Sequence, residues 1–180
     1  MIEKYQNKIA SLESLGSFYY QKSINEKYSS IDIASINIKY GTSLTDTNRN
    51  KGLFPLLASN GISDYVDIHN SYNVVTFGCR GTLGNVFYNK GECFILNTAF
   101  YIENYKEYGN LYFALKHEKG LTLYQSGAVQ PQITIDSIKD VVLKFPTNSK
   151  LNNVLDLIWN NTLIIKKLKE IKQLLLSKYF

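Results

Sequence analysis

The sequence predicts a mixed α/β protein, with one globular domain between a short N-terminal helix and a long C-terminal helix. Three observations lead to this fold class. Apolar residues recur at helical spacing at both ends of the chain, over residues 1–20 and 148–180. Over residues 21–147, short apolar runs alternate with glycine-punctuated connections, as in strands joined by turns. A chain of 180 residues is long enough to bury one core of this kind.

The first segment carries Ile2, Tyr5, Ile9 and Leu12 at spacings of three or four residues, with polar residues between them. This spacing places the four side chains on one face of a helix, which we expect to end near Gly16. A helix this short is marginally stable in water, so its apolar face requires a partner surface.

The central segment reads as strands with a few helical turns. A short helix is expected within residues 28–38, and a second helix over 108–115. An apolar run that includes Pro55 ends at Ser59-Asn60-Gly61, which is typical of a turn. Strands are further expected at residues 74–77, 86–88, 93–96, 99–102, 133–135 and 141–145. Pro146 is expected to close the domain.

The last segment shows the clearest helical pattern. Its apolar positions recur at an average spacing near that of a coiled coil, and roughly 30 residues at about 1.5 Å each give a rod of about 45 Å. An exposed apolar face of that length requires another helix, either from a second copy or from a different protein. The eight positions of this C-terminal stripe are Leu151, Leu155, Ile158, Thr162, Ile165, Leu168, Ile171 and Leu175.

Composition narrows the function classes. An apolar content of 44% and a charged content of 19% are typical of a globular protein. The net charge of +5 is compatible with a polyanionic partner without requiring one. Arg49 and Lys51, in a polar loop, are candidates for phosphate contacts, although solvent exposure alone also explains them. The sequence shows neither an apolar run long enough for a membrane span nor a signal peptide, so we expect a cytoplasmic protein.

The loop around Arg80 is the first candidate for DNA contact. Glycines at 78, 81 and 84 allow close approach of the backbone, and arginine can bind guanine through two parallel hydrogen bonds. Thr82 and Asn85 add short donors and acceptors to the same loop. An ordinary turn between strands has similar composition, so the pattern alone leaves both interpretations open.

Two other polar turns offer groups that suit adenine. Ser59 and Asn60 are candidates for DNA contact. The Asn60 amide suits the major-groove edge of adenine, although Asn-Gly is also simply a favoured tight turn. Gln130 and Gln132 flank a proline in a third loop, where they fit either adenine contact or plain surface polarity.

The sequence gives no sign of an enzyme. An Asn/Asp-Pro-Pro-aromatic methyltransferase motif, a Gly-x-Ser-x-Gly elbow and a carboxylate–lysine nuclease array are all missing. Cys79 and Cys93 are expected to be small buried residues, and His69 and His117 lack ligand spacing. We therefore expect no catalytic residues, no metal site and no cofactor in this chain.

Several segments, taken in order, resemble the target recognition domain of type I restriction-modification specificity subunits. The matching segments are residues 41–44, 52–61, 75–88, 96–99, 126–131 and the helix from Leu151. The resemblance implies a subunit that binds double-stranded DNA for an N6-adenine methyltransferase subunit and, in the full complex, a restriction subunit. S-adenosylmethionine, ATP and magnesium would then be bound by the partner subunits.

The chain departs from that family pattern because it has one recognition domain instead of two. The resemblance therefore implies half a specificity subunit, which could restore the two-domain arrangement by homodimerising through the C-terminal stripe. Pairing with another specificity chain remains an alternative partner arrangement. A regulatory fragment that occupies the methyltransferase or a full-length specificity subunit without directing modification remains an alternative function.

Overall fold

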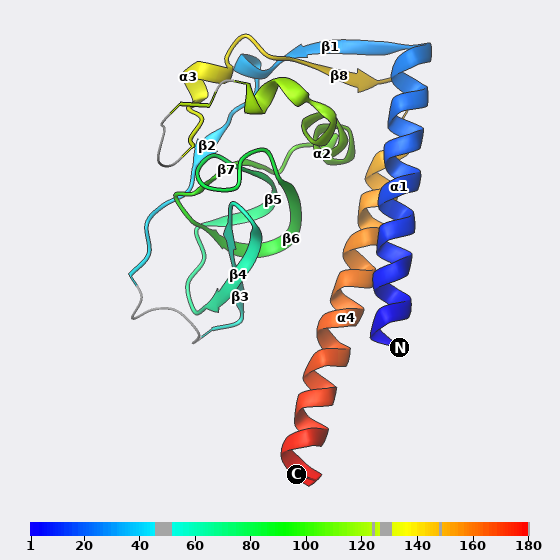
Figure 1. Ribbon diagram of the computed structural model, residues 1–180, viewed down its shortest axis with the longest axis vertical. Helices are drawn as coiled ribbons and strands as arrows, with labels where there is room; N and C mark the ends of the chain where they lie inside the picture. Colours follow the sequence, from blue (N-terminus) through cyan, green and yellow to red (C-terminus); the bar gives the residue numbers. More distant parts are fainter. Residues whose placement is uncertain (46–51, 124, 127–130, 148, 180) are drawn as a thin grey trace.

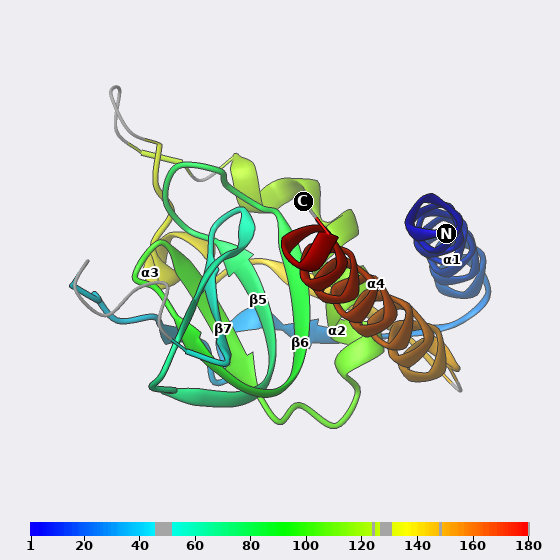
Figure 2. The ribbon, with the colours of Figure 1, turned by 90° about the horizontal axis from the view of Figure 1, so that it is seen from below.

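The computed structural model describes residues 1–45, 52–123, 125–126, 131–147 and 149–179. A strand-rich domain lies beside two long helices, α1 (Ile2–Glu26) and α4 (Leu151–Tyr179), which run antiparallel to each other (Figure 1). Seen from below, α4 lies between α1 and the strands (Figure 2). This arrangement confirms the predicted mixed α/β class with a helix at each end. In the described part of the chain, no helix combines the length and apolarity needed to cross a membrane.

The main sheet has six strands in the order β2-β7-β5-β6-β3-β4. Neighbouring strands are antiparallel except β3 and β6, which pair in parallel through Leu56–Phe94 and Leu57–Ile95. Most of β5 is buried, because it lies in the interior of the sheet between β6 and β7. The strands are β2 (Lys39–Tyr40), β3 (Phe54–Ala58), β4 (Gly61–Val66), β5 (Ser71–Gly78), β6 (Val86–Ile95) and β7 (Ala99–Glu103).

A second sheet joins the two ends of the domain. Strand β1 (Tyr28–Asp32) pairs antiparallel with β8 (Val142–Pro146), from Tyr28 opposite Pro146 to Asp32 opposite Val142. The helix expected within residues 28–38 is therefore wrong, apart from the single 3-10 turn η1 (Ile33–Ser35). Residues 28–32 become a strand because β8 supplies the hydrogen-bonding partner, which a local pattern does not reveal.

Helix α2 (Tyr108–His117) lies at the centre of the main core. Residues 109–115 are all buried, and the largest buried rings nearby are Phe77, Phe100 and Phe113. The helix predicted at 108–115 is thus confirmed. Two short helical segments follow, η3 (Lys119–Thr122) and α3 (Ile135–Ile138).

Helix α1 does not end near Gly16, as the sequence predicted, but continues to Glu26. Gly16 is buried, and a β-carbon at this position would overlap the ring of Phe113 on α2. The glycine therefore marks the point where α1 crosses close to α2, and it does not act as a helix terminator. The partner surface that the sequence required for this helix is supplied by α4 and α2.

Three of the predicted strands also need correction. The runs at 86–88 and 93–96 belong largely to one strand, β6, which stays continuous through Gly91 at a φ of +93°. The run at 133–135 is not a strand, because Thr134 caps α3 by accepting a hydrogen bond from the Ser137 backbone. By contrast, β5, β7 and β8 confirm the strands expected at 74–77, 99–102 and 141–145.

The C-terminal stripe divides into two parts. Leu151, Leu155 and Ile158 are buried in the main core of the chain itself, so these three do not offer a surface to a second chain. This corrects the prediction that the whole stripe forms a partner interface. Thr162, Ile165 and Leu168 are half-buried. Toward the C-terminus Ile171 and Leu175 are exposed by 52% and 53%, and α4 extends past the N-terminus of α1 (Figure 1).

Candidate nucleic-acid interface

The first predicted turn joins β3 to β4 as a tight hairpin. Ala58 pairs with Gly61, whose φ of +99° is favourable only for glycine, and this leaves Ser59 and Asn60 at the tip. The side chain of Asn60 is exposed. Ser59, however, is only 9% exposed and packs beneath the neighbouring loop, close to Gly78 and Gly81. Little of the Ser59 side chain is therefore accessible to DNA, and its contact with DNA stays a prediction.

The neighbouring loop, residues 78–85, is closed by its own backbone. The Gly78 N–H donates to the Asn85 carbonyl at 3.1 Å, and the Gly84 N–H donates to the Gly78 carbonyl at 3.2 Å. A β-carbon on Gly78 would overlap the backbone carbonyl of Thr82, so glycine is required for this compact path. The loop leaves the side chains of Arg80, Thr82 and Asn85 exposed.

The third predicted segment lies against the second. The Gly81 N–H donates to the Pro131 carbonyl at 3.2 Å, and the Ile133 N–H donates to the Cys79 carbonyl at 2.9 Å. Gln132 is consequently paired with Arg80 in an isolated antiparallel bridge, and its side chain is half-exposed.

Sequence reasoning did not identify the turn between β6 and β7 as part of the site. The Thr98 carbonyl accepts hydrogen bonds from the backbone N–H groups of Cys79 at 2.9 Å and Arg80 at 3.2 Å. The Thr98 hydroxyl oxygen accepts a third, from the Ser59 N–H at 3.2 Å. The strands expected at 93–96 and 99–102 leave Asn97 and Thr98 as the connection between them, but they do not indicate that this connection holds the other loops.

The structure therefore brings five of the nine predicted DNA-binding residues to one end of the sheet as exposed or half-exposed side chains: Asn60, Arg80, Thr82, Asn85 and Gln132. Ser59 lies beneath them. Arg49, Lys51 and Gln130 fall outside the residues that the structure describes.

Arg80 supplies an exposed positive charge at this end of the sheet. Over the described ranges, no side chain forms a hydrogen bond or ion pair with its guanidinium group.

The adjacent Cys79 thiol is buried, and burial raises its pKa to about 11, so it is protonated at neutral pH. Burial likewise raises the pKa of Cys93 to about 12. No group of three His, Cys, Asp or Glu side chains suited to a metal occurs in the described segments. The arrangement can donate and accept hydrogen bonds and supply positive charge.

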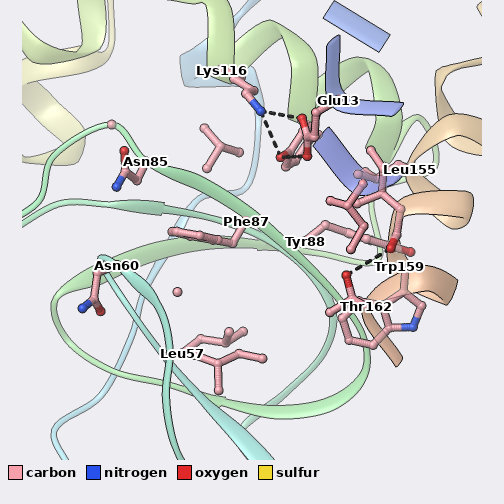
Figure 3. Close-up of a pocket in the computed structure, with 17 residues that line it drawn as sticks. Glu13, Leu57, Asn60, Asn85, Phe87, Tyr88, Lys116, Leu155, Trp159 and Thr162 are labelled. Carbon is pink, nitrogen blue, oxygen red and sulfur yellow. Dashed lines mark hydrogen bonds and ion pairs between the residues drawn. The ribbon is translucent and has the colours of Figure 1, made fainter. Parts of the chain in front are cut away.

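A cleft of about 670 Å³ separates this end of the sheet from the helices (Figure 3). Asn60 and Asn85 line one side of it, while Trp159 and Thr162 of α4 line the other. At its upper edge in the view, Glu13 of α1 accepts a hydrogen bond from the Tyr112 hydroxyl at 2.8 Å.

Lys116 of α2 forms an ion pair with the same Glu13 carboxylate, which is therefore fully engaged in joining α1 to α2. Burial, followed by the nearby Glu13 charge, strongly raises the pKa of Tyr112. This cluster holds the two helices together and closes one end of the cleft.

Comparison with solved structures shows which known fold the chain shares. The S subunit of a type I restriction-modification system from M. genitalium gives a TM-score of 0.60 at 17% identity, over 82% of this chain and 41% of that chain. The HsdS subunit from Thermoanaerobacter tengcongensis gives 0.53 at 13% identity, over 94% and 49%. A structure reported for the assembly and conformational transition of the type I R-M system gives 0.53 at 11% identity, over 98% and 53%. The chain thus spans about half the length of these proteins.

Comparison with curated protein sequences finds no match. The family model for the type I restriction modification DNA specificity domain, by contrast, matches residues 17–175. The sequence led us to expect a DNA-recognition component and not an enzyme, and this match agrees with that expectation. Since the family model covers most of its length, the chain belongs to the type I restriction modification DNA specificity domain family.

Proposed function

We propose that this chain reads one half of a bipartite site in double-stranded DNA and docks an N6-adenine methyltransferase subunit. One observation carries the proposal. Three loops that are distant in sequence converge at one end of the sheet, where Asn60, Arg80, Thr82, Asn85 and Gln132 present hydrogen-bonding side chains to solvent. S-adenosylmethionine, ATP and magnesium would be held by the partner subunits, and the complex would act in the cytoplasm.

Each side chain has a role that its chemistry allows. Arg80 can donate two parallel hydrogen bonds to O6 and N7 of guanine, and it is exposed for this purpose. Asn60 and Gln132 can each pair with N6 and N7 of adenine. Thr82 and Asn85 serve as additional contacts to bases or to the backbone, and Arg49, Lys51 and Gln130 extend the same surface in this proposal.

The second half of the site would be read by a second copy. The exposed end of α4 carries Ile171, Leu174, Leu175 and Leu176, all between 48% and 68% exposed, and another helix would remove this apolar surface from water. Half-buried Thr162, Ile165 and Leu168 extend the same proposed interface. Two identical readers related by a two-fold axis require an inverted repeat. Helices of about 45 Å limit the half-sites to centres about one DNA turn apart.

The test is to co-express the chain with its methyltransferase subunit in a host that lacks adenine methylation, and to map N6-methyladenine in the host DNA. The expected result is an inverted repeat with unread bases between its halves. An asymmetric gapped motif would mean that this chain reads one half-site and that a different protein, in place of a second copy, reads the other. A complex that is intact yet leaves the DNA unmethylated would contradict the proposal and favour a regulatory fragment that only occupies its partner.

A further inference from the structure

We infer that Thr98 is a positioning residue that fixes the distance between the Asn60 turn and the Arg80 loop, and thereby sets which bases are read together. The inference rests on the proposed function, because it concerns how the reading side chains are held. Thr98 itself lies in the turn between β6 and β7 and is half-buried.

The geometry gives Thr98 two separate connections. Its carbonyl accepts the N–H groups of Cys79 and Arg80, so the backbone of the turn holds the second loop. Its hydroxyl oxygen accepts the Ser59 N–H at 3.2 Å, so its side chain holds the hairpin tip that carries Asn60. One residue therefore links two reading elements through two different groups.

The turn that contains Thr98 is itself anchored. The Asn97 N–H donates to the Thr42 carbonyl at 3.2 Å, and the Asn97 amide donates to the Ser43 hydroxyl at 2.9 Å. In addition, the Leu96 N–H donates to the Leu57 carbonyl at 2.8 Å, which fixes strand β3 up to the hairpin. Beyond Leu57, the Thr98 hydroxyl accepts the N–H of Ser59, the first of the two tip residues.

Loss of the Thr98 hydroxyl would leave the Ser59 N–H buried without that acceptor, and the hairpin tip would shift relative to Arg80. Contacts with phosphates tolerate such a shift, since they depend mainly on charge. Contacts with base edges do not, because each needs a hydrogen-bond geometry within a few tenths of an ångström. The chemical consequence is a selective loss of discrimination between DNA sequences.

The test compares Thr98→Val with Thr98→Ser in the complex with the methyltransferase subunit. Binding is measured to a duplex carrying the site mapped by methylation, and to a duplex with altered half-sites. The Val variant is expected to lower the ratio of specific to non-specific affinity by about tenfold, while non-specific affinity is unchanged. The Ser variant keeps the hydroxyl and is expected to keep the ratio.

Thr76→Val provides the matched control. Thr76 is fully buried in β5 of the same sheet, and its hydroxyl has no hydrogen-bond partner among the residues that the structure describes. The substitution makes the same exchange of hydroxyl for methyl without removing a bond, so the affinity ratio should not change. If Thr98→Val behaves like Thr76→Val, or if it lowers specific and non-specific affinity equally, the inference is wrong.

A double-mutant cycle separates positioning from direct contact. Asn60→Ala and Arg80→Ala should be energetically coupled in the wild-type background and nearly additive in the Thr98→Val background. Coupling that persists at full size in both backgrounds would overturn the inference. A wild-type complex that shows no sequence preference would instead refute the proposed function, so the two failures are distinguishable.

Discussion

The ring of Phe113 lies against Gly16 so closely that a β-carbon on the glycine would come within 3.0 Å of three ring atoms. Phe113 is completely buried, so its ring has no free space into which to move. This contact between α1 and α2 brings the N-terminal helix onto the domain, and it determines how close together the two helices can lie.

Replacing Gly16 by leucine should therefore destabilise the protein. Leucine is a better helix former than glycine, yet overpacking at this crossing should lower the free energy of unfolding by about 1–3 kcal/mol. Urea unfolding followed by circular dichroism measures the change. Ser14→Leu, at an exposed position of the same helix, is the control and should leave stability nearly unchanged. A Gly16→Leu variant as stable as wild type would contradict the packing that we describe.

Leu155→Ala should destabilise the domain itself. Leu155 is 1% exposed and packs in the main core, so its truncation leaves a cavity and should cost about 2–5 kcal/mol in the free energy of unfolding. Chemical unfolding at low protein concentration is the measurement. The comparison variant is Leu175→Ala, whose side chain is 53% exposed and whose loss should change stability of the monomer by less than about 0.5 kcal/mol.

Self-association should depend on the exposed end of α4. Leu174→Glu combined with Leu175→Glu introduces two charges into the apolar surface, and sedimentation velocity should show a shift from dimer toward monomer. Gln173→Glu adds a charge at the adjacent exposed position and should leave the dimer intact. A wild-type chain that stays monomeric at high micromolar concentration would rule out the homodimer part of the proposal.

Stability should fall in alkaline solution partly because of Tyr112. Its folded-state pKa is raised above the ordinary value of 10.0, so the folded protein keeps the proton that the unfolded chain releases. Its contribution is complete below pH 10 and is lost at about 1.4 kcal/mol per pH unit as the pH rises above 10. Tyr112→Phe should lose less stability than wild type between pH 8 and pH 11. Tyr72→Phe, at an exposed ring, should follow the wild-type curve.

Arg80→Ala should weaken binding to the mapped site by about 1–3 kcal/mol and relax discrimination at one base pair of each half-site. Competition binding with single-base variants of the site gives both quantities. Lys22→Ala, which removes an exposed charge from α1, should change neither. A uniform loss of affinity for all duplexes would instead indicate that Arg80 contacts a phosphate of the DNA backbone.

Local patterns predicted the elements whose structure is determined locally. The periodicity from Ile2 to Leu12 and the apolar run in β5 reflect a helix face and a buried strand, and both formed as expected. The strand β1 was missed because its hydrogen bonds come from β8 at the other end of the domain. The spacing of Leu151 and Leu155 showed that they share one helix face, but spacing does not reveal whether that face is covered by the same chain or by another.

Local sequence patterns likewise predicted only part of the candidate site. Turn signals located the loops of Asn60 and Arg80, because glycine is needed where φ is positive. They did not predict that Ser59 would be buried or that Thr98 would bind its N–H, since that bond joins residues 39 positions apart. Which loops converge depends on the order of the strands in the sheet. The parallel pairing of β3 with β6 cannot be recognised from the sequence of either strand alone.

The way in which the loops that we propose to read DNA are held has a consequence for the evolution of this protein. Most of the bonds that shape them join main-chain atoms, such as Gly78 with Asn85 and Gly81 with Pro131. Main-chain bonds survive when a neighbouring exposed side chain is exchanged. If these loops read DNA as proposed, a lineage can therefore acquire a new DNA target by point substitutions at positions such as Arg80 and Asn60, while the scaffold is inherited unaltered.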